Sequence, residues 1–270
     1  MQNPSTLEVF RVRHPLKFRL LRVARVVPLS PALVRVTLTG DLDDFVSASF
    51  DDHVKVFFPP AGAEKPVLPT LGPDGPVFPE GEENRAAMRD YTPRRFDAEA
   101  GELDLEFALH EAGPATAWAA NAQPGHYLGI GGPRGSMVIP TGFDWHLLIG
   151  DDTALPAIQR RLTELPAGAR VAVVVEVENR AARIELPTET DLYAIWCYRD
   201  EATSDNPLLD AVDQVWLPPG TGYVWAAGEA AAIRAVRTHL VNDRGVDKKR
   251  IRASAYWRRG AQATHETIDD

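Results

Sequence analysis

The chain has 270 residues, 44% of them hydrophobic and 25% charged, which is the composition of an ordinary globular protein long enough for two domains. Its 38 acidic residues outnumber the 29 basic ones and give a formal net charge of -9. This charge repels nucleic acid, so we expect no nucleic-acid partner. The single cysteine, Cys197, excludes intramolecular disulfides, cysteine zinc sites and resident iron-sulfur clusters.

Hydrophobic residues are spread along the chain, and no apolar run approaches the roughly 20 residues that span a bilayer. The amino-terminal segment also lacks the apolar centre of a signal peptide. We therefore expect no membrane insertion and a cytoplasmic location. The histidines lie far apart, with no His-x-x-x-His pair, so we expect no resident metal site.

The first half of the chain has the pattern of β-strands. Residues 18–39 alternate apolar and polar side chains around a Pro-Leu-Ser-Pro turn, which predicts two antiparallel strands. Further strands are predicted at 51–59, 89–96 and 101–110. The stretch 59–88 is so rich in proline and glycine that it predicts a surface loop without regular elements. With one short helix, this half predicts a small antiparallel β-barrel.

In the second half, strands and helices alternate. The apolar strand "DWHLLIG" precedes the helix "DTALPAIQRRLTELP", with Asp152 or Thr153 as its cap, and the strand "ARVAVVVEVE" is typical of a buried parallel sheet. The alternation continues to the last strand, "RIRASAYWRRG", and predicts a doubly wound α/β domain. We place the boundary near residues 140–144, between a β-barrel domain at 1–140 and an α/β domain at 145–270.

The segment "RDYTPRR" concentrates three arginines in an acidic chain. A period of two sends Arg89 and Tyr91 to one face of the predicted strand and Thr92 to the other. A planar cation beside an aromatic ring suits a ligand that has both a phosphate and a flat ring system. Taken alone, however, these seven residues favour a barrel strand with a solvated arginine face.

Two further segments could approach a phosphate. In "HEAGPATAWA", Gly113 stands at the start of the predicted helix, followed by Pro114 and Ala115, so the free backbone N–H groups are open to an anion. The loop "GGPRGS" places glycines around Arg134. It matches neither the Walker loop nor the dinucleotide fingerprint.

Together, the sequence Arg89-x-Tyr91-Thr92 and the segments "HEAGPATAWA", "GGPRGS", "LLIGDDTALPAI", "WAAGE" and "YWRRG" resemble the siderophore-interacting proteins in order and spacing. These are flavin-dependent ferric-siderophore reductases of the ferredoxin reductase superfamily, and the resemblance extends over residues 16–266. It implies a two-domain, ferredoxin-reductase-like fold. An N-terminal antiparallel FAD-binding β-barrel would be joined to a C-terminal, NAD(P)H-binding-like α/β domain with a doubly wound parallel sheet.

The resemblance also implies roles for individual residues. Arg89 would meet the FAD pyrophosphate, while Tyr91 and Thr92, nearest the chemistry, would lie against the isoalloxazine ring and bond near its N5 edge. The other implied cofactor positions are His110, Gly113, Pro114 and Ala115 for the ribityl and phosphate portion, Gly135 and Ser136 for the flavin, and Asp151, Thr153 and Ala154 near the adenine or the electron donor.

Basic residues would bind the anionic ferric siderophore. Two basic positions of the family pattern correspond to Lys55 and to Arg258 in "YWRRG". Strand alternation points Lys55 away from Val54 and Val56. Arg134 could serve either the substrate or a phosphate. For Lys55 and Arg258 an ordinary surface charge is about as good an interpretation.

The implied activity is transfer of electrons from NADH or NADPH, or from reduced ferredoxin, through FAD to Fe(III), so that Fe(II) is released in the cytoplasm. Two alternatives are a general NAD(P)H-dependent flavin or ferredoxin reductase and a non-catalytic ferric-siderophore-binding protein. "GDDTALP" replaces the glycine-richer nucleotide loop usual in ferredoxin reductases, so the donor stays open. The siderophore class, catecholate or hydroxamate, and the oligomeric state also stay open.

Overall fold

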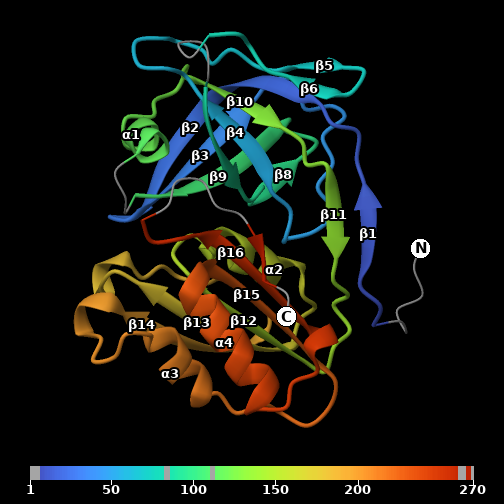
Figure 1. Ribbon diagram of the computed structural model, residues 1–270, viewed down its shortest axis with the longest axis vertical. Coiled ribbons are helices and arrows are strands. Elements are labelled where there is room, and N and C mark those ends of the chain that lie inside the picture. Colours follow the sequence, from blue (N-terminus) through green and yellow to red (C-terminus); the bar gives the residue numbers. More distant parts are fainter. Residues whose placement is uncertain (1–6, 82–85, 110–112, 261–265, 269–270) are drawn as a thin grey trace. The chain divides into compact units, whose positions relative to one another are not determined.

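The computed structural model describes residues 7–81, 86–109, 113–260 and 266–268. The chain divides into two compact units (Figure 1). One is Val9–Ile139, and the other is Pro140–Asp270 together with the first residues of the chain. Leu7 and Glu8 therefore group with the second unit, whereas the predicted barrel domain began at residue 1.

The first unit consists of strands with one short helix. Its elements are β1 (Phe10–Arg13), β2 (Phe18–Ser30), β3 (Leu33–Thr39), β4 (Val54–Phe58), β5 (Thr70–Gly72), β6 (Gly75–Val77), β7 (Ala87–Tyr91), β8 (Arg95–Asp97), β9 (Glu102–Ala108), α1 (Pro114–Ala120), β10 (Tyr127–Gly131) and β11 (Gly135–Val138).

In the described part of this unit, seven strands form one antiparallel sheet in the order β7-β4-β10-β2-β3-β9-β8. The long hairpin β2–β3 lies at its centre, with Val26 opposite Val36. The sheet curls until the ring of Tyr91 in β7 lies 4.4 Å from that of Phe107 in β9, centroid to centroid. The predicted antiparallel barrel is thus confirmed, as a half-barrel around an apolar core.

The proline- and glycine-rich stretch 59–88 is not free of regular structure, so that prediction was wrong. Strands β5 and β6 form a small hairpin in which Thr70 faces Val77 and Gly72 faces Gly75. A two-stranded hairpin has no inner strand, so Pro76 can sit where its missing N–H is not needed. Gly75 has a φ of 124°, a conformation that favours glycine and lets the chain turn back.

The second unit alternates strands and helices. Its elements are β12 (Trp145–Asp151), α2 (Leu155–Glu164), β13 (Arg170–Val177), η2 (Arg180–Ala182), β14 (Asp191–Tyr198), η3 (Arg199–Glu201), α3 (Pro207–Asp213), β15 (Gly222–Glu229), α4 (Ala230–Asn242), η4 (Lys248–Arg250), β16 (Ile251–Trp257) and β17 (Glu266–Thr267).

The strands of the second unit pair in the order β14-β13-β12-β15-β16-β17, and all pairs are parallel except β16–β17. Helices α3 and α4 pack together over one face, where Leu147 and Ile149 of β12 join their core. Helix α2 packs on the other face, and Ala154 just before it lies against Gly150. The predicted doubly wound parallel sheet is confirmed.

Side chains define where two of these helices begin. The Asn206 side chain accepts from the backbone N–H of Leu209 at the start of α3, and Glu229 accepts from Ala231 and Ala232 at the start of α4. Helix α2 differs from the prediction. Neither Asp152 nor Thr153 caps it, because the helix starts after Ala154, which has no side-chain acceptor.

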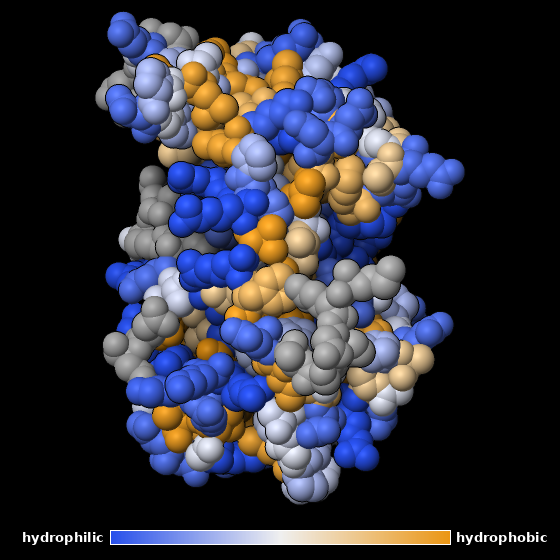
Figure 2. Space-filling model, turned by 90° about the vertical axis from the view of Figure 1, so that its right-hand side faces the viewer, coloured by the Kyte–Doolittle hydropathy of each residue, from blue (hydrophilic) through white to orange (hydrophobic). Residues whose placement is uncertain are grey.

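The surface carries both hydrophilic and apolar side chains. On the face drawn in Figure 2, hydrophilic side chains predominate and apolar ones form separate small patches. Large apolar side chains do reach the surface, such as Leu71 and Val77 on the β5–β6 hairpin. Among the residues that the structure describes, no helix is long and apolar enough to cross a membrane.

Phe107 provides a test of the half-barrel core. Its side chain is fully buried, and the rings of Tyr91 and Trp118 lie 4.4 and 5.8 Å away. Phe107→Ala should lower the free energy of unfolding by about 3–5 kcal/mol, measured by urea denaturation. Phe78→Ala is the matched control, because Phe78 is 46% exposed and its loss should cost less than about 1 kcal/mol. Equal losses for the two variants would contradict this packing.

His146 in β12 is a buried histidine at the amino end of the parallel sheet. It is 2% exposed, its Nε2 lies 3.3 Å from the carbonyl oxygen of Thr141, and its ring meets the edge of Phe143. Burial, with a smaller contribution from the positive charge of Arg161, lowers the pKa of His146 to about 4. His146 is therefore neutral in the folded protein under ordinary conditions.

The lowered pKa of His146 predicts a pH dependence. Between pH 6.5 and about 4 the unfolded chain protonates this histidine while the folded protein does not, so stability should fall as the pH falls, by at most about 3 kcal/mol. Urea denaturation at a series of pH values should show a shallower decline for His146→Gln. The exposed His126 serves as control, and His126→Gln should keep the wild-type slope. An unchanged slope in His146→Gln would refute the assignment.

Candidate functional site

Strand β7 carries the segment singled out in the sequence. It pairs with β4 so that Asp90 faces Lys55 and Tyr91 faces Val54. The Tyr91 ring packs against Phe107, and burial raises the pKa of its hydroxyl well above the usual range. The next residue, Thr92, is only 6% exposed. Tyr91 and Thr92 are thus held firmly by the half-barrel at the end of one strand.

The three arginines of "RDYTPRR" have different partners. Arg94 Nε lies 3.8 Å from the buried carboxylate of Glu106. Arg89 donates one hydrogen bond to the carbonyl oxygen of Met88 and has no carboxylate partner among the described residues. Arg95 instead binds three carboxylates of β8 and β9, those of Asp97, Glu102 and Asp104.

This difference bears on anion binding. The charges of Arg94 and Arg95 are compensated within the half-barrel, whereas the Arg89 guanidinium keeps donors that can fork onto phosphate oxygens. Of the arginines in the segment, Arg89 is therefore the one suited to a phosphorylated ligand.

Helix α1 lies against β7 and begins as predicted. Gly113 is the residue before it, Pro114 is its first residue, and Ala115 is buried in the first turn. Among the described residues, no side chain caps this start, and no atom lies within 4 Å of where a Cβ on Gly113 would be. The backbone N–H groups of the first turn can therefore be reached by an anion. His110, predicted to act beside them, lies outside the described residues.

The loop "GGPRGS" has a structural role. The Ser136 hydroxyl donates to Asp52 at 2.7 Å and accepts from the backbone N–H of Ala48 at 3.1 Å, and His14 Nε2 lies 2.7 Å from it. A Cβ on Gly135 would come within 2.6 Å of the carbonyl oxygen of Val12. Both residues thus allow β11 to pair closely with β1.

Two of the three basic residues predicted to bind siderophore, Lys55 and Arg258, have an acidic partner. Lys55 Nζ lies 2.8 Å from the carboxylate of Asp90, across the β4–β7 pair, with the lysine side chain 49% exposed. Arg258 Nη2 lies 3.2 Å from Glu266 Oε2. Burial of Val54 and Val56 confirms that Lys55 points outward. The sequence did not reveal these carboxylates, because pairing across strands is decided by register.

Arg134, the third predicted substrate residue, is exposed in the loop between β10 and β11. Its carbonyl oxygen accepts from the backbone N–H of His14 at 3.0 Å. Its backbone is therefore held in place while its side chain faces solvent.

At the carboxyl end of β12, Asp151 is 2% exposed and accepts four hydrogen bonds. Oδ1 receives the backbone N–H and the hydroxyl of Thr153, at 3.0 and 2.5 Å. Oδ2 receives the backbone N–H of Glu229 at 2.9 Å and the indole Nε1–H of Trp257 at 2.7 Å. Burial and the neighbouring Asp152 raise the pKa of this carboxyl.

The predicted trio of Asp151, Thr153 and Ala154 therefore forms the turn that joins β12 to α2. The carboxylate of Asp151 points into the protein, and Ala154 is fully buried. Trp257, to which no role was assigned from the sequence, donates to this carboxylate and holds the end of β16 in place.

Beside this turn, a group of charged side chains joins the carboxyl ends of β12, β13 and β14. Arg199, at the end of β14, binds Asp152 at 2.6 Å, Glu176 at 3.3 Å and Glu178 at 3.2 Å. We call these four residues the Arg199 cluster. Sequence reasoning missed it, although acidic residues directly after a buried parallel strand are a usable signal.

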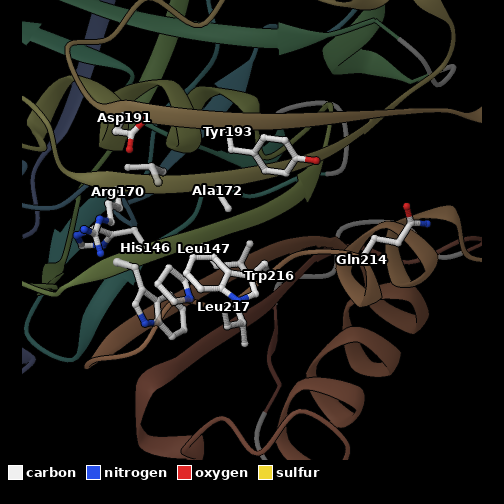
Figure 3. Close-up of a pocket in the computed structure, with 12 residues that line it drawn as sticks. His146, Leu147, Arg170, Ala172, Asp191, Tyr193, Gln214, Trp216 and Leu217 are labelled. Carbon is white, nitrogen blue, oxygen red and sulfur yellow. The ribbon is translucent and has the colours of Figure 1, made fainter.

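A pocket of about 410 Å³ opens at the opposite, amino-terminal edge of the same sheet (Figure 3). Its lining includes Arg170, Asp191, Tyr193, Trp216 and Leu217. The side chains of Tyr193 and Trp216 are 61% and 73% exposed. It contains none of the predicted site residues. Because ligands of open α/β sheets bind at the carboxyl ends of the strands, it is not the nucleotide site expected from the topology.

Two family models match most of the chain. The family model described as siderophore-interacting FAD-binding domain matches residues 22–137, and that described as siderophore-interacting protein matches residues 143–260. The NADPH-dependent ferric-chelate reductase of Escherichia coli is 37% identical over 251 residues, 92% of this chain and 95% of the relative. Ferric vibriobactin reductase ViuB of Vibrio cholerae is 35% identical over 254 residues, 92% of this chain and 93% of the relative.

Solved structures of similar proteins point to the same family. A siderophore utilization protein from T. fusca has a TM-score of 0.86 at 40% identity, covering 95% of this chain and 98% of that one. The siderophore-interacting protein SipS from Aeromonas hydrophila has a TM-score of 0.73 at 31% identity, covering 89% and 98%. The ferredoxin reductase in carbazole 1,9a-dioxygenase, at 18% identity and a TM-score of 0.63, shares the fold. The chain belongs to the siderophore-interacting protein family.

Proposed function

We propose that this protein is an FAD-dependent reductase of ferric siderophores, which passes electrons from a nicotinamide nucleotide to Fe(III). The observation that carries the proposal is the arrangement on β7 and α1. Among the described residues, an arginine without a carboxylate partner, a partly buried tyrosine and a helix start without a side-chain cap lie together in the unit that the FAD-binding family model matches. Two relatives that match more than nine tenths of the chain are named as ferric reductases.

The side chains at this place suit FAD. Arg89 and the backbone N–H groups after Gly113 can neutralise and bind the pyrophosphate. Tyr91 offers an aromatic face to the isoalloxazine ring, and Thr92 can hydrogen-bond near the N5 edge. The bound flavin supplies the exchange between two-electron and one-electron steps that hydride donors and iron require.

The remaining cofactor positions support these contacts. Gly135 contacts β1 and Ser136 donates to Asp52. These interactions hold the loop that we assign to the flavin. Asp151, Thr153 and Ala154 form the β12–α2 turn, and we assign this turn to the adenine or the donor on the family pattern. We include Pro114, Ala115 and His110 on the family pattern.

Basic side chains would bind the ferric siderophore. We assign this role to Lys55 and Arg134 in the half-barrel unit and to Arg258 in the α/β unit. Oxygen chelators hold Fe(III) far more tightly than Fe(II), so reduction releases the metal to other ligands. No protein acid or nucleophile has to act on the chelate. We place the reaction in the cytoplasm, with ferredoxin as the alternative donor.

An anaerobic spectrum tests the activity. The purified protein should show bound flavin that bleaches with a nicotinamide nucleotide and recovers when ferric siderophore is added. Arg89→Ala should weaken FAD binding by about tenfold or more, because it removes a charge-assisted contact to phosphate. Arg11→Ala, which removes an exposed arginine of β1, should leave the FAD content unchanged. Protein without flavin, or flavin that no donor bleaches, would indicate a binding protein, and equal reduction of free flavin would indicate a general flavin reductase.

The Lys55–Asp90 pair tests the substrate assignment. Lys55→Ala should raise the KM for an anionic ferric siderophore by about three- to tenfold, and Arg258→Ala should do the same. Asp90→Asn should lower this KM, because it frees the lysine from its counterion. The exposed Lys249 is the charge control, since Lys249→Ala should leave KM at the wild-type value. Loss of FAD from Lys55→Ala and Arg258→Ala would overturn the assignment.

A further inference from the structure

The pocket at the amino-terminal edge of the parallel sheet, here called the Trp216 pocket, exists because helix α3 is short. Val174 of β13 and Ile195 of β14 join the core that α3 and α4 cover. Side-chain alternation places Ala172 and Tyr193 on the same face, one step nearer the amino ends of their strands. Helix α3 ends at Asp213, and the chain continues as a loop. Beyond the end of the helix, the face is left open as a pocket.

Two aromatic side chains of the Trp216 pocket are largely exposed to solvent. They come from different sides of the pocket, Tyr193 from β14 and Trp216 from the loop after α3 (Figure 3). This loop is held firmly, since Val215 is buried and its carbonyl oxygen accepts from the guanidinium of Arg244 at 2.6 Å. Tyrosine and tryptophan rings in fixed positions give a large contact area at a low cost in conformational entropy, which is typical of binding surfaces.

The rim of the pocket carries one positive and one negative side chain, Arg170 and Asp191. These two residues face each other across the β13–β14 pair. Both are exposed, and within the described part of the chain neither side chain has an ion pair or a hydrogen bond. Lys55 and Asp90, which face each other across the β4–β7 pair, do form an ion pair. Arg170 and Asp191 therefore keep their donors and acceptors for a ligand.

The charges of the Trp216 pocket favour a ligand that is itself both positive and negative. Arg170 and Asp191 offset each other, and the buried His146 in the lining is neutral because its pKa is lowered to about 4. A simple anion would be repelled by Asp191, and a simple cation by Arg170. A small molecule with a carboxylate and an ammonium group close together would satisfy both side chains. The volume of about 410 Å³ is that of a small-molecule site.

We propose that the Trp216 pocket binds a free aromatic amino acid. Its carboxylate lies at Arg170, its ammonium group at Asp191, and its ring between Tyr193 and Trp216. A residue inside a peptide has lost both charges, so the site selects the free amino acid. The pocket shares no residue with the positions assigned to FAD and siderophore, and the inference does not depend on the reductase function.

Titration of the holoprotein with related probes, followed by ligand-observed NMR, tests the inference. L-phenylalanine should bind with a Kd of about 1 mM or below. The probe 2-phenylethylamine lacks the carboxylate and 3-phenylpropionate lacks the ammonium group, so each should bind at least about tenfold more weakly. L-alanine keeps both charges but lacks the ring, and its binding should be weaker by a similar factor.

Three variants test the individual contacts. Trp216→Ala should weaken the binding of L-phenylalanine by about tenfold or more. Arg170→Gln should remove the advantage of L-phenylalanine over 2-phenylethylamine, and Asp191→Asn should remove its advantage over 3-phenylpropionate. Arg234→Gln, a matched change of an exposed arginine on α4, should leave every Kd at the wild-type value.

The four substituted side chains are exposed, so the variants should keep the wild-type flavin content and melting temperature. The site is ruled out if L-phenylalanine does not bind, if the wild type binds the three phenyl probes equally, or if Trp216→Ala leaves the binding unchanged. None of these results bears on the reductase function, which is judged by the bleaching of the flavin.

Discussion

The α/β unit depends on one buried carboxylate, that of Asp151. Four donors converge on it from the β12–α2 turn, the end of β15 and the end of β16. An ionised group so deeply buried is tolerable only when its acceptor sites are filled, so these segments must keep their mutual positions. Gly228 belongs to the same constraint. It has a φ of 151°, and a Cβ there would lie 2.6 Å from Oδ2 of Asp151. These hydrogen bonds hold the β12–α2 turn and the carboxyl ends of β15 and β16 together.

The second constraint is the pairing of basic side chains with carboxylates, which limits the ligands that they can bind. The chain carries 29 basic residues, but many of those near the expected sites are bound by carboxylates of their own unit. Arg95 and Arg199 each bind three carboxylates, and Lys55 and Arg258 each have one acidic partner. What a basic residue can bind is therefore set by its partners rather than by its own charge. Arg89 stands out because no carboxylate among the described residues contacts its guanidinium, which donates only to the carbonyl oxygen of Met88.

The sequence predicted most of the fold because side-chain periodicity is a local property. Alternation identified β2 and β3, and continuous apolar runs identified β12 and β13 as interior strands of a parallel sheet. The failures were also local in origin. The β5–β6 hairpin was missed because proline and glycine usually mark loops. The start of α2 was misplaced because Asp152 pairs with Arg199 and the Thr153 hydroxyl donates to Asp151, so neither side chain caps the helix.

By itself, the sequence determined the two-part architecture and the family resemblance, and it predicted a set of site residues. These follow from patterns and motifs that need no knowledge of distant contacts. Only the tertiary structure decided which charges remain available. The register of β4 on β7 brings Asp90 to Lys55, and the parallel strands bring Glu176, Glu178 and Asp152 to Arg199. The physical reason is that an ion pair between residues far apart in the chain depends on strand order and register, which the local pattern of side chains does not specify.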